Sequence, residues 1–84
     1  GPVPVGATIN FTCTGAVGDT CEIIIDDSGK QIVLDPKEIK DNGRGQAFAD
    51  FYWTAARGSY QVVAQVKNSV GNTNNSLSQA LEVQ

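Results

Sequence analysis

Histidine and methionine are both absent from the 84 residues of this sequence. Histidine is the commonest general base in enzymes and the commonest metal ligand, so a chain without it lacks the usual machinery of hydrolases. Two cysteines alone leave the tetrahedral ligand set of a metal site incomplete. We therefore expect a protein that is not an enzyme, has no catalytic residues and holds no metal or other cofactor.

Long apolar runs and clusters of basic residues are absent as well. No apolar stretch approaches the ~20 residues that a membrane-spanning helix needs, and no signal-like segment opens the chain. The six lysines and arginines are scattered and the net charge is -3, whereas nucleic acids and anionic membranes are bound by clustered positive charge. We expect neither nucleic acid binding nor membrane insertion.

A chain of 84 residues has room for one domain with one hydrophobic core. A domain of this size buries only about 60–65% of the surface of its unfolded chain, so its stability margin is small. The first five residues, from Gly1 to Val5, include two prolines. They fit either the remnant of a removed tag or the end of a proline-containing linker, and the sequence leaves both alternatives open.

The dominant sequence pattern is an alternation with a period of two. Between residues 7 and 14, odd positions carry Ala, Ile, Phe and Cys, while even positions carry Thr and Asn. Residues 46–54 and 59–67 alternate in a similar way. This pattern predicts β-strands with one face in a core and the other face in water.

Further strands are indicated on both sides of a tight turn. Three consecutive isoleucines lie within residues 21–27, and β-branched residues favour strands. Asp26 to Gly29 has the composition of a tight turn, in which Gly29 can take a positive φ, and residues 31–34 return as the partner strand. A last strand is expected within residues 77–83.

Six or seven short strands separated by turn residues predict an all-β fold, either a sandwich or a small barrel.

One segment departs from the pattern. At residues 35–40, Asp35 could cap a helix and Pro36 would occupy its first position, so we expect one helical turn or a loop there. The strand alternation predicts the following core residues: Ile9, Phe11, Ile24, Phe51, Trp53, Tyr60, Val62, Ala64, Val66 and Leu81.

Residues 51–71 contain the spacing Gly-x-Tyr-x-Val-x-x-x-Val-x-Asn-x-x-Gly. Its fixed positions are Gly58, Tyr60, Val62, Val66, Asn68 and Gly71. This stretch resembles the E and F strands of bacterial and phage immunoglobulin-like modules and is similar to the polycystic-kidney-disease-type repeat; residues 4–7 fit the same families. The resemblance implies one immunoglobulin-like antiparallel β-sandwich of about seven strands over residues 1–84. It also places Tyr60 at the tyrosine corner, where its hydroxyl bonds upstream backbone.

The sequence departs from antibody-type domains at two places. Those domains pair a cysteine on strand B with one on strand F, but here Cys13 falls on B and Val62 holds the F position. The core tryptophan of strand C is missing, and Trp53 lies on the E strand instead. These departures disfavour an antibody or vertebrate receptor domain, and the resemblance itself implies a fold that hosts many unrelated functions.

Cys13 and Cys21 flank a seven-residue loop. A disulfide between them would close this loop and stabilise the domain by about 2–3 kcal/mol. The alternative is two free thiols in a reducing compartment, with Cys13 acting as a small core residue. We favour the disulfide because two cysteines at facing strand ends suit its geometry.

The alternation places Phe48 and Tyr52 on the outward face of their strand, beside Thr8, Asn10 and Thr12. An aromatic surface fringed by amides and hydroxyls can stack a sugar ring or bind a partner protein. The alternative is that the N-terminal segment or a neighbouring domain covers these aromatic side chains.

In the topology that the resemblance implies, the loops at residues 15–20, 41–45 and 68–75 gather at one end. They offer hydrogen-bonding side chains that make a candidate binding tip: Asp19, Asn42, Arg44, Asn72, Asn74 and Asn75. Loops on a rigid scaffold often carry recognition. The alternative is that these loops are solvated turns.

The resemblance and the lack of a catalytic set predict a non-catalytic accessory or display module of a larger surface assembly. The first hypothesis is a phage virion protein, in the capsid decoration or the tail, that mediates surface attachment. One alternative is a stalk or tip domain of a bacterial surface adhesin. Another is a carbohydrate-binding domain of a secreted glycoside hydrolase, with a surface glycan as ligand. Otherwise the expected partners are parent-protein domains or the virion or cell-surface assembly, and the location is the virion surface or the extracellular or cell surface.

Overall fold

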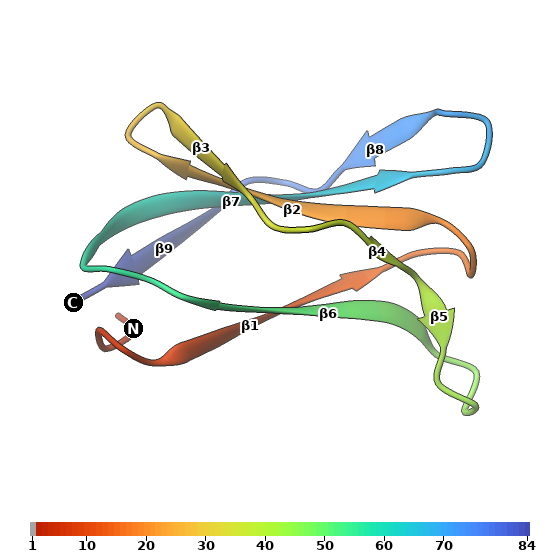
Figure 1. Ribbon diagram of the computed structural model, residues 1–84, viewed down its shortest axis with the longest axis horizontal. Helices are drawn as coiled ribbons and strands as arrows, with labels where there is room; N and C mark the ends of the chain where they lie inside the picture. Colours follow the sequence, from red (N-terminus) through yellow and green to blue (C-terminus); the bar gives the residue numbers. More distant parts are fainter. Residues whose placement is uncertain (1) are drawn as a thin grey trace.

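The computed structural model describes residues 2–84, in which two antiparallel β-sheets pack against each other (Figure 1). Gly1, the first residue of the expected linker or tag remnant, lies outside the described residues. The strands are β1 (Thr8–Thr14), β2 (Thr20–Asp27), β3 (Lys30–Val33), β4 (Lys37–Glu38), β5 (Lys40–Asp41), β6 (Ala47–Thr54), β7 (Gly58–Lys67), β8 (Thr73–Asn75) and β9 (Gln79–Val83). No helix occurs in residues 2–84, and the predicted all-β sandwich is confirmed.

The two sheets differ in size. The smaller sheet has the strand order β1-β6-β5, and the larger one has the order β3-β2-β7, with β8 and β9 paired to β7 and β4 paired to β2. β1 runs antiparallel to β6 along its whole length, from Thr8 opposite Thr54 to Thr14 opposite Phe48. Figure 1 shows β1 and β6 in one layer and β2 and β7 in the other.

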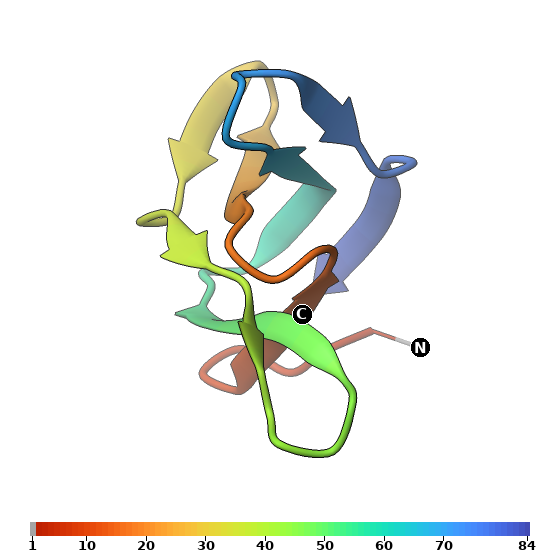
Figure 2. The same cartoon turned by 90° about the vertical axis from the view of Figure 1, so that its right-hand side faces the viewer.

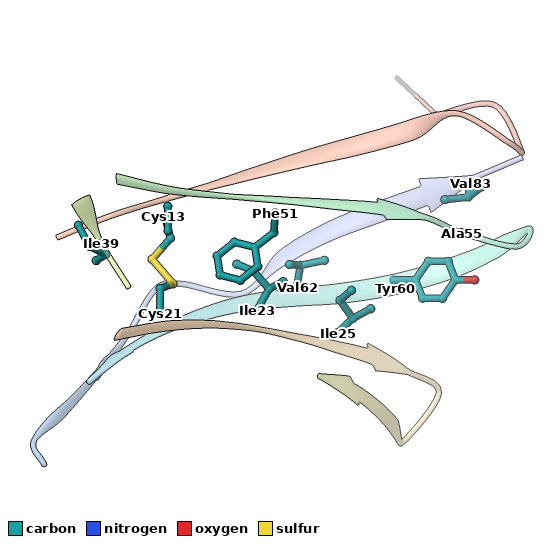
Figure 3. Packing of buried hydrophobic residues seen from close by; sticks show 11 residues of the cluster. Cys13, Cys21, Ile23, Ile25, Ile39, Phe51, Ala55, Tyr60, Val62 and Val83 are labelled. Carbon is teal, nitrogen blue, oxygen red and sulfur yellow. A yellow bond between two sulfur atoms is a disulfide. The ribbon is translucent and has the colours of Figure 1, made fainter. Parts of the chain in front are cut away.

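The core lies between the sheets and is centred on Phe51 of β6, which is 2% exposed and points toward Ile23 and Val62 of the other sheet (Figure 3). The buried apolar residues come from both layers: Cys13, Cys21, Ile23, Ile25, Ile39, Ala49, Phe51, Ala55, Tyr60, Val62 and Val83. The predicted core residues that are partly buried and pack against this cluster are Ile9, Phe11, Trp53, Ala64, Val66 and Leu81.

The predicted core position of Ile24 is wrong. Ile23 and Ile25 are buried, whereas Ile24 lies on the other face of the sheet, opposite Val33 of β3. A run of three isoleucines does not reveal its own phase, because every position is apolar. The phase is set by Cys21, which is bonded to the opposite sheet and therefore puts positions 23 and 25 on the same inward face.

Residues 35–40, for which one helical turn or a loop was predicted, contain strand residues and no helix. They contain β4, which pairs with β2, and the start of β5, which pairs with β6, so the chain crosses here from one sheet to the other. Ile39 is fully buried at the crossing; its N–H donates to the Asp19 carbonyl (2.8 Å) and its carbonyl accepts from the Gly18 N–H (2.9 Å). This burial and pairing outweigh a helix-start signal that only one short turn could use.

The predicted tight turn between β2 and β3 is confirmed. Ser28 and Gly29 both have positive φ, at 52° and 90°. Two such residues make the kind of turn whose twist matches the flanking strands of a hairpin. The Asp26 carboxylate accepts a hydrogen bond from the Gly29 N–H (3.3 Å) and closes the turn.

The predicted disulfide between Cys13 and Cys21 is confirmed, with a Cα–Cα distance of 6.6 Å. It joins β1 of the smaller sheet to β2 of the larger sheet and therefore crosses the core (Figure 3). Both sulfur-bearing side chains are buried beside Ile39. The bond ties the two layers together at the end where the chain passes from β1 to β2.

Tyr60 closes the opposite end of the core. Its ring is 5% exposed and its hydroxyl donates to the Ala56 carbonyl (2.7 Å), which is the upstream backbone bond predicted for this residue. The Trp53 ring meets Tyr60 edge-on, with centroids 5.1 Å apart. A Cβ at Gly58 would lie 3.3 Å from the Tyr60 hydroxyl oxygen, so this close approach favours glycine two residues before the tyrosine.

The segment before β1 is paired to the end of β9. Val3 forms a parallel bridge with Val83; its N–H donates to the Glu82 carbonyl (2.8 Å) and its carbonyl accepts from the Gln84 N–H (2.8 Å). These bonds join part of the expected linker or tag remnant to the sandwich. Whether residues 1–5 are a linker or a tag remnant stays open between the two predicted alternatives. Both ends of the described chain therefore lie at the same end of the sandwich (Figure 1).

Candidate functional site

The outer surface of β1 and β6 carries the two predicted aromatic positions. The register aligns the even-numbered residues of both strands on one outward side, here named the β1–β6 face: Thr8, Asn10, Thr12, Thr14, Phe48, Asp50, Tyr52 and Thr54. Tyr52 is 63% exposed and lies opposite Asn10. The structure thus brings Tyr52 together with the amide and hydroxyl groups that the alternation placed beside it.

Phe48 lies on the same face but not next to Tyr52. Four residues along a strand span about 13 Å, and Asp50 lies between the two rings. Phe48 is half-buried, opposite Thr14 on β1 and Lys40 on β5. The two rings therefore cannot stack on one small ligand together, and Tyr52 is the accessible one.

Asp50 is held in place by its neighbours on β1. Its Oδ1 accepts from Thr12 Oγ1 (2.7 Å) and from Asn10 Nδ2 (3.3 Å). Asn10 Nδ2 also donates to the Phe51 carbonyl (3.2 Å). Because these side chains bond one another, the polar part of the β1–β6 face has a fixed arrangement before any ligand arrives.

Lys37 of β4 reaches onto the edge of this face. Its Nζ donates to the Asp50 carbonyl (2.6 Å) and lies 5.3 Å from the centroid of the Phe51 ring and 5.9 Å from that of Tyr52. A cation at this distance is attracted to an aromatic ring. Lys37 also lines two shallow hollows, one beside Tyr52 and one beside Phe48.

The sequence analysis missed Lys37 as a member of this surface. It precedes Asp50 by thirteen residues and lies in the segment for which a helical turn or a loop was predicted. No local pattern pairs the two residues, since their contact depends on the chain crossing between sheets at Ile39.

The predicted tip loops lie together at the end opposite the chain termini (Figure 1). They span residues 15–19, 42–46 and 68–72. Seen end-on, the loops at 42–46 and 68–72 lie on opposite sides of this end, with the loop at 15–19 between them (Figure 2). The three loops share one end of the molecule but do not form one compact patch.

Short side-chain bonds shape two of these loops. Asn42 Oδ1 accepts from the Arg44 N–H (2.8 Å), and Asn68 Oδ1 accepts from the Asn72 N–H (3.0 Å). The predicted tip residues Arg44 and Asn72 are exposed, whereas Asp19 is half-buried and its carbonyl bonds the Ile39 N–H. The asparagines therefore act first on their own loops, and Arg44 is the charged group that the tip offers to solvent.

Asn74 and Asn75, also predicted for the tip, lie on strand β8 instead of in a loop. They pair in register with Val66 and Gln65 of β7, and Gln65 Nε2 donates to Asn75 Oδ1 (3.1 Å). Short polar strands of this kind are difficult to distinguish from loops, because asparagine favours turns.

The described residues contain no buried polar or charged side chain. Across the same part of the chain, no three His, Cys, Asp or Glu side chains are close enough to hold a metal ion together. Residues 2–84 include no helix of the length and hydrophobicity that crossing a membrane requires. The chemistry on offer is stacking on Tyr52, hydrogen bonding by amides and hydroxyls, and charge from Lys37 and Arg44.

Neither a protein-family model nor a curated protein matches this chain.

Proposed function

We propose that this chain is a non-catalytic binding module of immunoglobulin-like type that a larger surface assembly displays. The strand order supports the fold type, since β1-β6-β5 and β2-β7-β9 correspond to the B-E-D and C-F-G order of that family. The bond from Tyr60 to Ala56 at the expected tyrosine corner supports it as well. The favoured assembly is a phage virion, as a capsid decoration or tail component.

The separation of chain ends and tip loops carries this proposal. Both ends of the described chain lie at one end of the sandwich, and the three tip loops lie at the other (Figure 1). The longest dimension of the molecule is 37 Å. A module held by its chain ends therefore presents the tip loops away from its point of attachment, with the β1–β6 face along its side.

Deletion of this module from its parent protein tests the proposal. We expect particles or filaments to assemble in normal yield, because a displayed module contributes no joint between subunits. Attachment of the particles to the target surface, or the stability of the displayed assembly, should fall. A matched deletion mutant that fails to assemble would instead make the module a structural joint and refute the proposal.

Exposed Tyr52 favours a second candidate function, carbohydrate binding. A sugar ring could stack on Tyr52 while Asn10 and Thr8 of the β1–β6 face offer hydrogen bonds at its edge. The fixed network around Asp50 would limit the entropy lost on binding.

A glycan array with three proteins tests this candidate. The unaltered chain should bind a defined set of glycans, Tyr52→Ala should lose most of that binding, and Tyr52→Phe should keep it because stacking needs only the ring. Equal signals from the unaltered chain and from Tyr52→Ala would exclude Tyr52 as the sugar platform.

A further inference from the structure

β1 is an unprotected sheet edge. Within the described chain, β6 is the one strand that pairs with β1, so the other side of β1 is open over its seven residues. β1 contains no charged residue and no proline, two of the devices that keep an edge strand from pairing with another chain. The opposite edge of the same sheet, β5, is two residues long and both are charged. The contrast singles out β1 as the edge that is free to accept a strand.

The backbone of β1 offers hydrogen-bonding groups to this open side. Thr12 lies directly opposite Asp50, whose carbonyl accepts from Lys37 on the far side of β6. Two residues directly opposite each other in an antiparallel pair either bond each other or both direct their backbone groups away from the partner strand. Because the Asp50 carbonyl points away from β1, the N–H and C=O of Thr12 point away from β6. By alternation, the same holds for Thr8, Asn10 and Thr14. In the described structure, none of these four residues has a backbone hydrogen-bond partner on the open side of β1.

Two adjoining hollows run alongside this edge, here named the β1 seam. One wall is β1 from Asn10 to Thr14, and the other is formed by residues 74–76 together with Gln79. The floor is apolar and includes Ile23, Val62 and Ala64. No charged residue lines either hollow, although 18% of the sequence is charged.

We propose that the β1 seam binds an extended, uncharged segment of a partner polypeptide, which pairs with β1 as an added strand. Main-chain hydrogen bonds to Thr8, Asn10, Thr12 and Thr14 would supply affinity, as in other strand-addition complexes. Alternate side chains of the segment would point into the hollows. The apolar floor there selects small apolar side chains, and a charged one would lose its hydration without a partner.

A second copy of this chain fits the seam less well than a separate segment. The strand that inserts must bring free apolar side chains into the hollows. On β1 of another copy, Phe11 already packs against its own core and Cys13 is bonded to Cys21. The proposal needs neither the tip loops nor Tyr52, so it can be tested independently of the proposed display function.

A capped peptide of alternating threonine and valine, flanked by glutamines and of the length of β1, serves as the probe. Titrated into the isotope-labelled full chain, it should shift amide resonances of residues 8–14, 62–66 and 74–79 and leave Tyr52 and Lys37 unchanged. The same peptide with a central proline, which removes an N–H, should not bind. Absence of shifts at millimolar peptide, or shifts centred elsewhere, would overturn the proposal.

Gln79→Glu places one charge at the rim of the seam without changing side-chain size. Gln79 is exposed and pairs with Val62, so the fold should tolerate the change. Peptide affinity should fall about tenfold, because a charge must lose water when the strand docks. Gln31→Glu on exposed β3 is the matched control and should bind normally. Equal affinity for both variants would refute the assigned seam, as would a stable dimer of the unaltered chain that Gln79→Glu dissociates.

Discussion

The two ends of the sandwich are closed by different means. At the tip end, the disulfide between Cys13 and Cys21 joins the two sheets where the loops leave them (Figure 3). At the terminus end, the aromatic pair of Trp53 and Tyr60 packs over the core, and the Tyr60 hydroxyl bonds the Ala56 carbonyl. The tip end therefore has a covalent bond beside the buried Ile39, whereas the terminus end is closed by packing and hydrogen bonds alone.

This difference follows from what each end contains. The tip end holds three chain-reversing loops, which offer few apolar side chains, and a cross-link there acts mainly by restricting the unfolded chain. The terminus end has long strands and aromatic rings, so burial in the folded state can stabilise it directly. The tip end is therefore stabilised mainly because the disulfide restricts the unfolded chain, and the terminus end mainly because apolar side chains are buried in the folded state.

The largest effect is expected at Phe51, which lies in the core between the disulfide at one end and Tyr60 at the other (Figure 3). Phe51→Ala removes the centre of the core and should lower the free energy of unfolding by about 3–5 kcal/mol, as measured by urea denaturation. Trp53→Ala, which affects only the terminus end, should cost less because Trp53 is half-buried. A larger loss for Trp53→Ala than for Phe51→Ala would contradict this ranking.

Loss of the disulfide should weaken the tip end. The bond closes a loop with a sequence separation of 8, so the Cys13→Ala, Cys21→Ala double variant should lose about 2–3 kcal/mol of unfolding free energy. The air-purified chain should have an intact mass two hydrogen atoms below its reduced mass, and reductant should lower its melting temperature. Thiols that titrate fully in the folded, untreated protein would contradict the assignment.

The smallest effect is expected at the terminus end from one hydrogen bond. Tyr60→Phe keeps the ring but leaves the Ala56 carbonyl without its donor, and should cost about 1 kcal/mol in urea denaturation. Tyr52→Phe is the matched control, since Tyr52 is exposed and its hydroxyl should matter little. Equal stability of the two variants would show that the Tyr60 bond contributes nothing.

Alternation was sufficient to predict the elements whose two faces differ. β1, β6 and β7 each carry apolar and polar residues in turn, and their inward residues form or contact the core. The hairpin at Asp26–Gly29 and the disulfide were predicted from local chemistry and spacing. Tyr60 was placed by a resemblance, and its hydroxyl bond follows from that placement.

Features that depend on distant contacts could not be predicted in this way. Ile24 looked like Ile23 and Ile25, and only the bond from Cys21 to the opposite sheet decides which of them face inward. Ile39 is fully buried although it lies in a short polar segment, because the chain crosses between sheets there. Lys37 joins the β1–β6 face through the same crossing.

The parallel pairing of Val3 with the end of β9 has a mechanical consequence. A load applied between the two chain ends would slide these segments past each other. The Val3 bonds and the bond from the Val5 N–H to the Gln84 carbonyl (3.0 Å) would then bear the force together instead of opening one after another. Further inside, the segment between Cys13 and Cys21 cannot lengthen while the disulfide is intact. We expect a module of this design to hold its shape as a tether under pull and to yield in one cooperative step.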